Sequence, residues 1–152
     1  RVFLAGLGDK LRRHAERAFF LGQDQEGRSR RDRLESRLDR AIRKGRADVV
    51  SELEAELAMP PFPAEIGYVW QAWSRIRQRK GAGYSGPVPI EWTDIDAFLR
   101  RSGVVLVPYE IEFIEMIDDE FLKAYAAEPS PAERAAAIKD GLEQVAKSPP
   151  TR

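Results

Sequence analysis

The sequence predicts a mainly α-helical protein, with a compact helical domain, an N-terminal helical arm and little or no β-sheet. Apolar residues recur at three- and four-residue spacing in several segments, whereas the apolar β-branched run at residues 104–107 is short and is followed by Pro108. Clusters of proline and glycine separate the helical segments. We expect a basic arm or helical hairpin over residues 1–58, a core domain over residues 59–127, and a C-terminal helix with a disordered tail over residues 128–152.

Three helices are expected in the arm. Residues 7–22 can form a short amphipathic helix that Asp9 could cap. Residues 29–57 repeat apolar side chains about every four positions, and Gly45 should divide this run into two helices, the second capped by Asp48. The resulting narrow apolar stripe between charged flanks is what a helical hairpin or a self-association seam requires.

In the core domain, the first helix should begin at Pro63 and end at Gly81, a residue that suits a left-handed C-terminal cap. Its apolar side chains, which include Trp70 and Trp73, recur at three- and four-residue spacing. Several basic residues lie in its last turns, where they interact favourably with the negative end of the helix dipole. One face of this helix should therefore be buried.

A connector rich in glycine and proline follows at residues 81–92. Thr93 then offers an N-cap oxygen, with Asp96 three residues on, for a short helix that should close near Gly103. The run at residues 104–107 is interpreted as a linker that plugs the core.

The helix after Pro108 should carry its apolar side chains inward and its acidic side chains largely outward. The outward set is expected to be Glu110, Glu112, Glu115, Asp118, Asp119 and Glu120. A last helix should start at Ser130 and Pro131, which form a cap followed by proline at the first helical position.

Composition excludes several classes of protein. The chain has 152 residues and no cysteine, so it has neither a disulfide framework nor a cysteine-based zinc site. No apolar run approaches the roughly 18 residues of a membrane span, and the first six residues are too short for a signal peptide. We expect a soluble intracellular protein that does not bind membranes. Residue 1 is arginine, which leaves open a fragment, a processed product or a fusion segment.

Charge is distributed unevenly although the formal net charge is zero. Residues 1–46 hold 14 basic and 7 acidic side chains, and residues 47–152 hold 11 and 18. The basic arm and the acidic body could pair, within one chain or between copies. Clustered arginines also suit phosphate contacts, but acidic residues are threaded between them at intrahelical pairing distance, and aromatic residues for stacking on RNA are missing there. Nucleic-acid binding is therefore the weaker interpretation.

No constellation of residues predicts catalysis, a cofactor or a metal site. Residues 81–86 match G-x-G-x-x-G by letter, but they follow a helix and meet Pro87, so we interpret them as a connector. His14 lies among arginines without a nucleophile spaced for a relay, which indicates a solvated surface histidine. The acidic cluster at residues 115–120 lacks the spacing of a calcium loop and is interpreted as a solvated helix face. A helix-turn-helix around residues 102–103 is disfavoured, because its second helix is acidic and would repel phosphate.

Taken in order, the motifs of the core domain resemble those of tail assembly chaperones of long-tailed, siphovirus-like bacteriophages. The order is a proline-rich entry, a tryptophan helix ending in a basic turn, a glycine loop, and then three short motifs. These are Trp-Thr-Asp-Ile-Asp at residues 92–96, Pro-Tyr-Glu-Ile-Glu at residues 108–112 and Ile-Asp-Asp-Glu-Phe-Leu at residues 117–122. The resemblance departs from the family pattern at Tyr109, where tryptophan is expected, and it gives no support for residues 1–58.

The resemblance implies a non-enzymatic protein of the host cytoplasm. Such a protein binds the hydrophobic helices of the tape measure protein, helps to recruit tail tube subunits, and is not expected in the finished virion. Self-association through the N-terminal arm is a further expected contact. Two alternatives remain: a structural virion or head–tail component, and a small nucleic-acid-binding protein that acts through the basic arm.

Composition and spacing, rather than the resemblance, predict the partner-binding residues. A charge-rimmed apolar groove could take an amphipathic helix without demanding one particular sequence. Trp70 and Trp73 lie three residues apart on an apolar helix, which also fits a purely structural role in the core. The expected groove or its support consists of Trp70, Trp73, Trp92, Phe98 and Tyr109, with Arg75, Arg77 and Arg79 at the rim.

Overall fold

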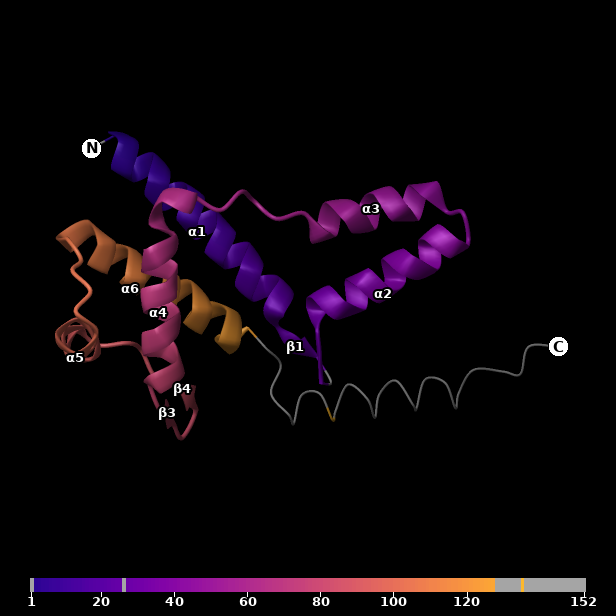
Figure 1. Ribbon diagram of the computed structural model, residues 1–152. Coiled ribbons are helices and arrows are strands. Elements are labelled where there is room, and N and C mark those ends of the chain that lie inside the picture. The colour runs from indigo at the N-terminus through magenta and orange to yellow at the C-terminus, as the bar shows by residue number, and fades with distance from the viewer. Residues whose placement is uncertain (1, 26, 128–134, 136–152) are drawn as a thin grey trace.

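The computed structural model describes residues 2–25, 27–127 and 135 (Figure 1). This part of the chain contains six α-helices, one 3-10 helix and two small antiparallel sheets of two strands each, so the expected mainly α fold is confirmed. None of the described helices is long and apolar enough to cross a membrane. The helix expected from Ser130 lies outside the described residues.

The helices of the described residues form two groups. The body consists of α1 (Val2–Gly22), α4 (Gly67–Arg79), α5 (Trp92–Ser102) and α6 (Pro108–Ala126), and the helical hairpin consists of α2 (Arg30–Arg43) and α3 (Ala47–Leu57). The remaining elements are β1 (Asp24–Gln25), β2 (Arg28–Ser29), the 3-10 helix η1 (Ala64–Ile66), β3 (Ala82–Gly83) and β4 (Gly86–Pro87). Figure 1 shows the helical hairpin extending away from the body, with α5 at the opposite end of the molecule.

The body is built around one hydrophobic cluster. Helices α1 and α6 pack along each other and α4 packs on α6. Four side chains at their contacts, Leu11, Val69, Ile114 and Ile117, are completely buried. They come from three helices that are distant in sequence, so this core depends on tertiary contacts rather than on any single amphipathic segment.

The helical hairpin has a second, smaller cluster. It contains Leu34 and Ala41 from α2, Leu53 from α3, and Leu21 from the last turn of α1. Helix α1 thus contributes to both clusters, because its earlier residues Leu7 and Leu11 belong to the body. The expected boundary between arm and core at residues 58 and 59 stays a prediction, although packing groups α1 with the core helices.

Several predicted helix ends differ from those observed. Helix α1 begins at Val2 rather than near Asp9, because its first turns have the body to pack against. Asp48 does not cap α3, whose N-cap is Arg46 without a side-chain hydrogen bond. Asp48 instead lies in the first turn of α3, where its carboxylate interacts favourably with the positive end of the helix dipole. Gly45 separates α2 from α3 as expected, with a positive φ of 66°.

Helices α4 and α5 also differ in detail from the prediction. Pro63 precedes η1, and α4 itself begins at Gly67. Its C-cap is Lys80 in an extended conformation, and Gly81 is not left-handed. Helix α5 starts at Trp92, two residues earlier than a Thr93 cap would place it, because the Asp94 carboxylate accepts the Glu91 N–H at 2.8 Å. Its left-handed end at Gly103 and the irregular linker that follows agree with the prediction. The linker does not plug the core as expected, because Val105 and Val107 are exposed and only Leu106 of residues 104–107 packs against the cluster.

The glycine-rich connector is a tight hairpin, in which Ala82 pairs with Pro87 and Gly83 with Gly86. Gly86 has a φ of 124°, and a Cβ atom there would lie 2.6 Å from the ring of Tyr125. Glycine at this position is therefore required by both backbone conformation and close packing on α6. The G-x-G-x-x-G letters here form a turn and no helix N-terminus, in agreement with the connector interpretation.

Candidate partner-binding groove

A cavity of about 440 Å³ lies between α5 and the first half of α6. Its apolar lining comes from Trp92, Ile95, Leu99, Pro108 and Ile111. Its acidic lining comes from Asp96, Glu112 and Glu115. We call this cavity the α5–α6 groove. An apolar surface edged by carboxylates can bind a side chain or a helix.

Trp92 is the one aromatic residue among the described residues that line the groove. It is the first residue of α5 and is 74% exposed. Its indole Nε1–H donates a hydrogen bond to the carboxylate of Glu115 on α6. The ring is thereby held across the groove from one edge, while most of its surface stays accessible to a partner. Exposed, oriented tryptophan is the residue type most enriched among binding hot spots.

The start of α5 is fixed by an ionic contact with the end of α4. The Nζ of Lys80 lies 2.6 Å from the Asp94 carboxylate and 3.3 Å from that of Glu91. The hydrogen bond to Asp94 raises the pKa of Lys80. Burial by itself would raise the pKa of Asp94, but the hydrogen bonds from Lys80 and from the Glu91 N–H outweigh it and lower that pKa. Both groups are therefore charged around neutral pH.

Behind the groove, a buried carboxylate joins three elements. Asp118 on α6 is 3% exposed and accepts hydrogen bonds from Trp73 Nε1 on α4 at 3.0 Å and from the Ile90 N–H at 2.8 Å. The guanidinium of Arg77 lies 3.5 Å from the same carboxylate and donates to the Val88 carbonyl at 2.7 Å. This network fixes α4, α6 and the β4–α5 connection to one another.

The expectation that the acidic residues of α6 form a solvated face is wrong for three of them. Glu110, Asp118 and Glu120 are buried, with exposures of 6%, 3% and 9%. Glu110 accepts hydrogen bonds from the Val107 N–H at 2.8 Å and from the Tyr68 hydroxyl. That hydroxyl contact, followed by burial, raises the pKa of Tyr68 to about 12. Burial of these carboxylates is tolerated because donors meet them.

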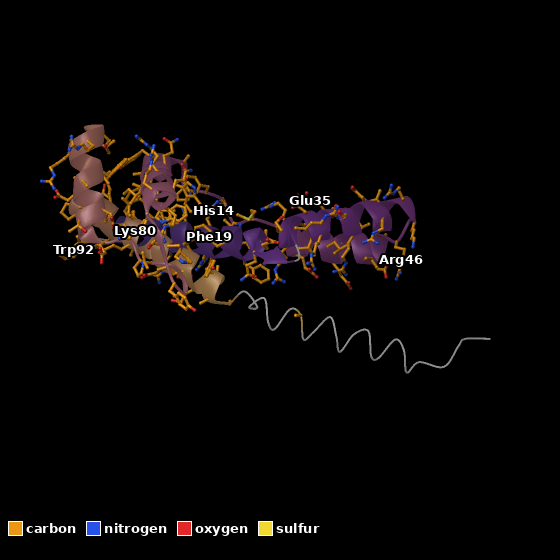
Figure 2. All side chains as sticks on the ribbon, turned by 90° about the horizontal axis from the view of Figure 1, so that it is seen from below. His14, Phe19, Glu35, Arg46, Lys80 and Trp92 are labelled. Atoms are coloured by element: carbon orange, nitrogen blue, oxygen red, sulfur yellow. The ribbon has the colours of Figure 1, made fainter. Side chains whose placement is uncertain are left out.

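Of the eight residues predicted to bind a partner, the structure places one in the groove, namely Trp92. Trp70 and Trp73 lie in an aromatic cluster of the body together with Phe19, Phe62 and Phe121. Trp73 is 6% exposed, so its role here is structural support. Figure 2 shows Phe19 near the middle of the molecule and Trp92 toward the end opposite the helical hairpin.

The other predicted residues are dispersed over the body. The guanidinium of Arg75 lies over the ring of Phe98, 5.2 Å from its centroid. Tyr109 packs on Phe113 on a different side of α6. Arg77 points inward and forms an ion pair with Asp118, whereas Arg79 is exposed at the end of α4. The predicted basic rim is therefore not the rim of the observed groove, whose charged lining is acidic.

His14 also differs from its prediction. It is half-buried, its Nδ1 lies 2.9 Å from the Pro60 carbonyl oxygen, and its ring meets the edges of Phe62 and Trp70. It therefore joins α1 to the segment between α3 and η1 and is not a solvated surface residue. Tertiary contact, which the flanking arginines do not indicate, explains the difference.

Most residues that line the groove were not predicted as binding residues. Ile95, Leu99 and Ile111 lie on apolar helix faces, and nothing in their spacing tells a groove from a filled core. The sequence feature that could have revealed the groove is the run of acidic residues next to these faces, on two consecutive helices joined by a short linker. In the described part of the chain, no group of three or more histidine or acidic side chains is placed to hold a metal ion.

A comparison with protein families finds a match in this region. Residues 50–123 match the family model described as phage tail assembly chaperone. The match runs from within α3 to within α6 and includes every residue that lines the groove. No curated protein and no solved structure matches the chain. The resemblance drawn from the sequence motifs is thus confirmed: residues 50–123 are similar to the phage tail assembly chaperone family.

Proposed function

We propose that this chain is a non-enzymatic chaperone of the host cytoplasm that binds amphipathic helices of the tape measure protein in the α5–α6 groove and helps to recruit tail tube subunits. The observation that carries the proposal is the groove itself, an accessible apolar trough with an exposed tryptophan inside the segment that matches the chaperone family. The match of residues 50–123 to that family model supports a phage tail protein as the partner.

The groove suits a helix better than an extended peptide. No sheet edge borders it, since the helices α5 and α6 supply all of its lining residues. An extended peptide would therefore find no backbone ladder to join. A helix can place apolar side chains every three or four residues against Trp92, Leu99 and Ile111, and the acidic lining favours basic residues flanking those anchors. Long tape measure helices of that pattern would otherwise expose apolar surface and aggregate.

The decisive experiment is co-expression of the tagged chain with the tape measure protein of its own genome, followed by pull-down. Trp92→Ala should reduce capture about tenfold or more, since a buried aromatic anchor is typically worth 2 kcal/mol or more. Tyr84→Ala is the matched control, because Tyr84 is fully exposed in the β3–β4 turn and does not line the groove. Equal capture by both variants, or no capture by the unmodified chain, would contradict the proposal.

Recruitment of tube subunits is tested by the same approach. A complex with the tape measure protein should bind the tail tube protein, and purified particles should lack the chaperone. Its presence in the virion in fixed stoichiometry would instead favour the structural alternative.

A further inference from the structure

We propose that the turn of the helical hairpin of one copy docks in the α5–α6 groove of a second copy, so that the chain self-associates head to tail. The hairpin tip is defined as residues 42–46, the last turn of α2 and the connection to α3. This contact requires no tail protein, so its test is independent of the proposed function.

The tip combines an apolar projection with positive charge. Ile42 is 56% exposed although it follows the buried Ala41. Arg43, Lys44 and Arg46 surround it and are exposed. In the described part of the chain, none of these three cations pairs with a carboxylate. A single apolar side chain among unpaired cations is complementary to an apolar cavity edged by carboxylates.

The groove has the matching features. Its apolar lining can receive Ile42 and the methylene stems of the neighbouring basic residues. Glu112 is exposed and makes no ion pair among the described residues, and Asp96 pairs only with the exposed Arg100, 2.5 Å away. These carboxylates can therefore accept cations from another molecule at little cost in lost internal contacts.

A contact between tip and groove within one molecule is excluded by the shape of the chain. Figure 1 shows the α2–α3 turn at one end of the molecule and α5 at the other, and Figure 2, seen from below, likewise places Arg46 and Trp92 at opposite ends. The two surfaces can meet only when they belong to different copies. Such a contact joins unlike surfaces, so it repeats and produces either rings or open chains.

Sedimentation velocity across low micromolar to submillimolar concentration tests this directly. The average mass should rise with concentration, and high salt should suppress the rise, because the contact is small and charge-dependent. Ile42→Ser should weaken association about tenfold without affecting folding, because this side chain already lies largely in solvent.

Charge reversal supplies the sharpest control. The tip variant Arg43→Glu with Arg46→Glu, and the groove variant Asp96→Lys with Glu112→Lys, should each be monomeric alone. An equimolar mixture of the two should associate again, because the acidic tip then meets a basic groove. The pair Arg13→Glu with Arg79→Glu changes the same number of charges at exposed sites outside both surfaces and should behave as the unmodified chain.

The proposal is overturned if the unmodified chain stays monomeric at all concentrations, or if the mixture of variants does not associate. It is also overturned if the unmodified chain binds duplex DNA and the tip variant does not, while the two chains self-associate equally or not at all. That result would assign the tip to nucleic acid.

Discussion

The body and the helical hairpin achieve burial with different chemistry. The body combines aromatic rings with carboxylates that are buried and hydrogen-bonded, whereas the buried residues of the hairpin cluster are all aliphatic. Directional bonds to Asp118 fix three elements at defined positions, while aliphatic contacts tolerate repacking. The groove therefore belongs to the body, whose packing geometry is fixed by directional bonds. The tip belongs to the helical hairpin, whose packing can vary more.

The largest effect should come from removing the carboxylate of Asp118. Asp118→Ala leaves Trp73 Nε1 and the Ile90 N–H without their acceptor and the Arg77 guanidinium without its counter-ion, which should lower the free energy of unfolding by about 3–5 kcal/mol. Urea unfolding followed by tryptophan fluorescence measures it. The neighbouring Asp119 is exposed, so Asp119→Ala should change stability by less than about 0.5 kcal/mol. Equal effects of the two variants would mean that the network does not specify the body.

A smaller and more local effect is expected in the helical hairpin. Leu53 is 2% exposed, and Leu53→Ala should cost about 2–3 kcal/mol through the cavity it leaves. Hydrogen exchange should accelerate in α2 and α3 while α4 and α6 keep their protection. Glu54→Ala, at an exposed neighbouring position, should leave exchange unchanged. Acceleration throughout the body would show that the body and the helical hairpin unfold together, which would contradict this prediction.

The smallest expected effect is the pH dependence of stability that Tyr68 causes. The Tyr68 pKa is raised to about 12 because its hydroxyl donates to Glu110, so this contact stabilises the fold below the ordinary tyrosine pKa of about 10 and is lost as the pH rises through 12. Tyr68 is 45% exposed, and solvent screening should limit the contribution to about 1 kcal/mol. In a spectrophotometric titration, Glu110→Gln should return the pKa of Tyr68 toward its ordinary value. An unchanged titration curve would rule out Glu110 as the cause.

Local signals in the sequence predicted the helices well. Gly45 and Gly103 end helices with positive φ, and Pro108 opens α6, because these residues act through their own backbone geometry. Helix starts were less predictable, because the N-cap of α5 depends on which of several acidic residues reaches back, and Asp94 does so rather than Asp96.

The site could be predicted only in part, for a reason visible at Asp118. On a helix it follows Ile114 by four residues and therefore lies on the inner face, yet the cost of burying a charge favours the solvated interpretation. Its donors come from Trp73 and Ile90, whose proximity is a tertiary fact. The same applies to the tryptophans, since spacing alone cannot show that Trp73 is enclosed and Trp92 exposed.

Helix α1 supplies side chains to both hydrophobic clusters, so it is a continuous strut between the body and the helical hairpin. Its 21 residues span about 30 Å without a break, with Leu7 and Leu11 held by the body and Leu21 held by the helical hairpin. A tilt of α1 against α6 would therefore carry the helical hairpin with it, because one continuous helix makes the contacts with both clusters.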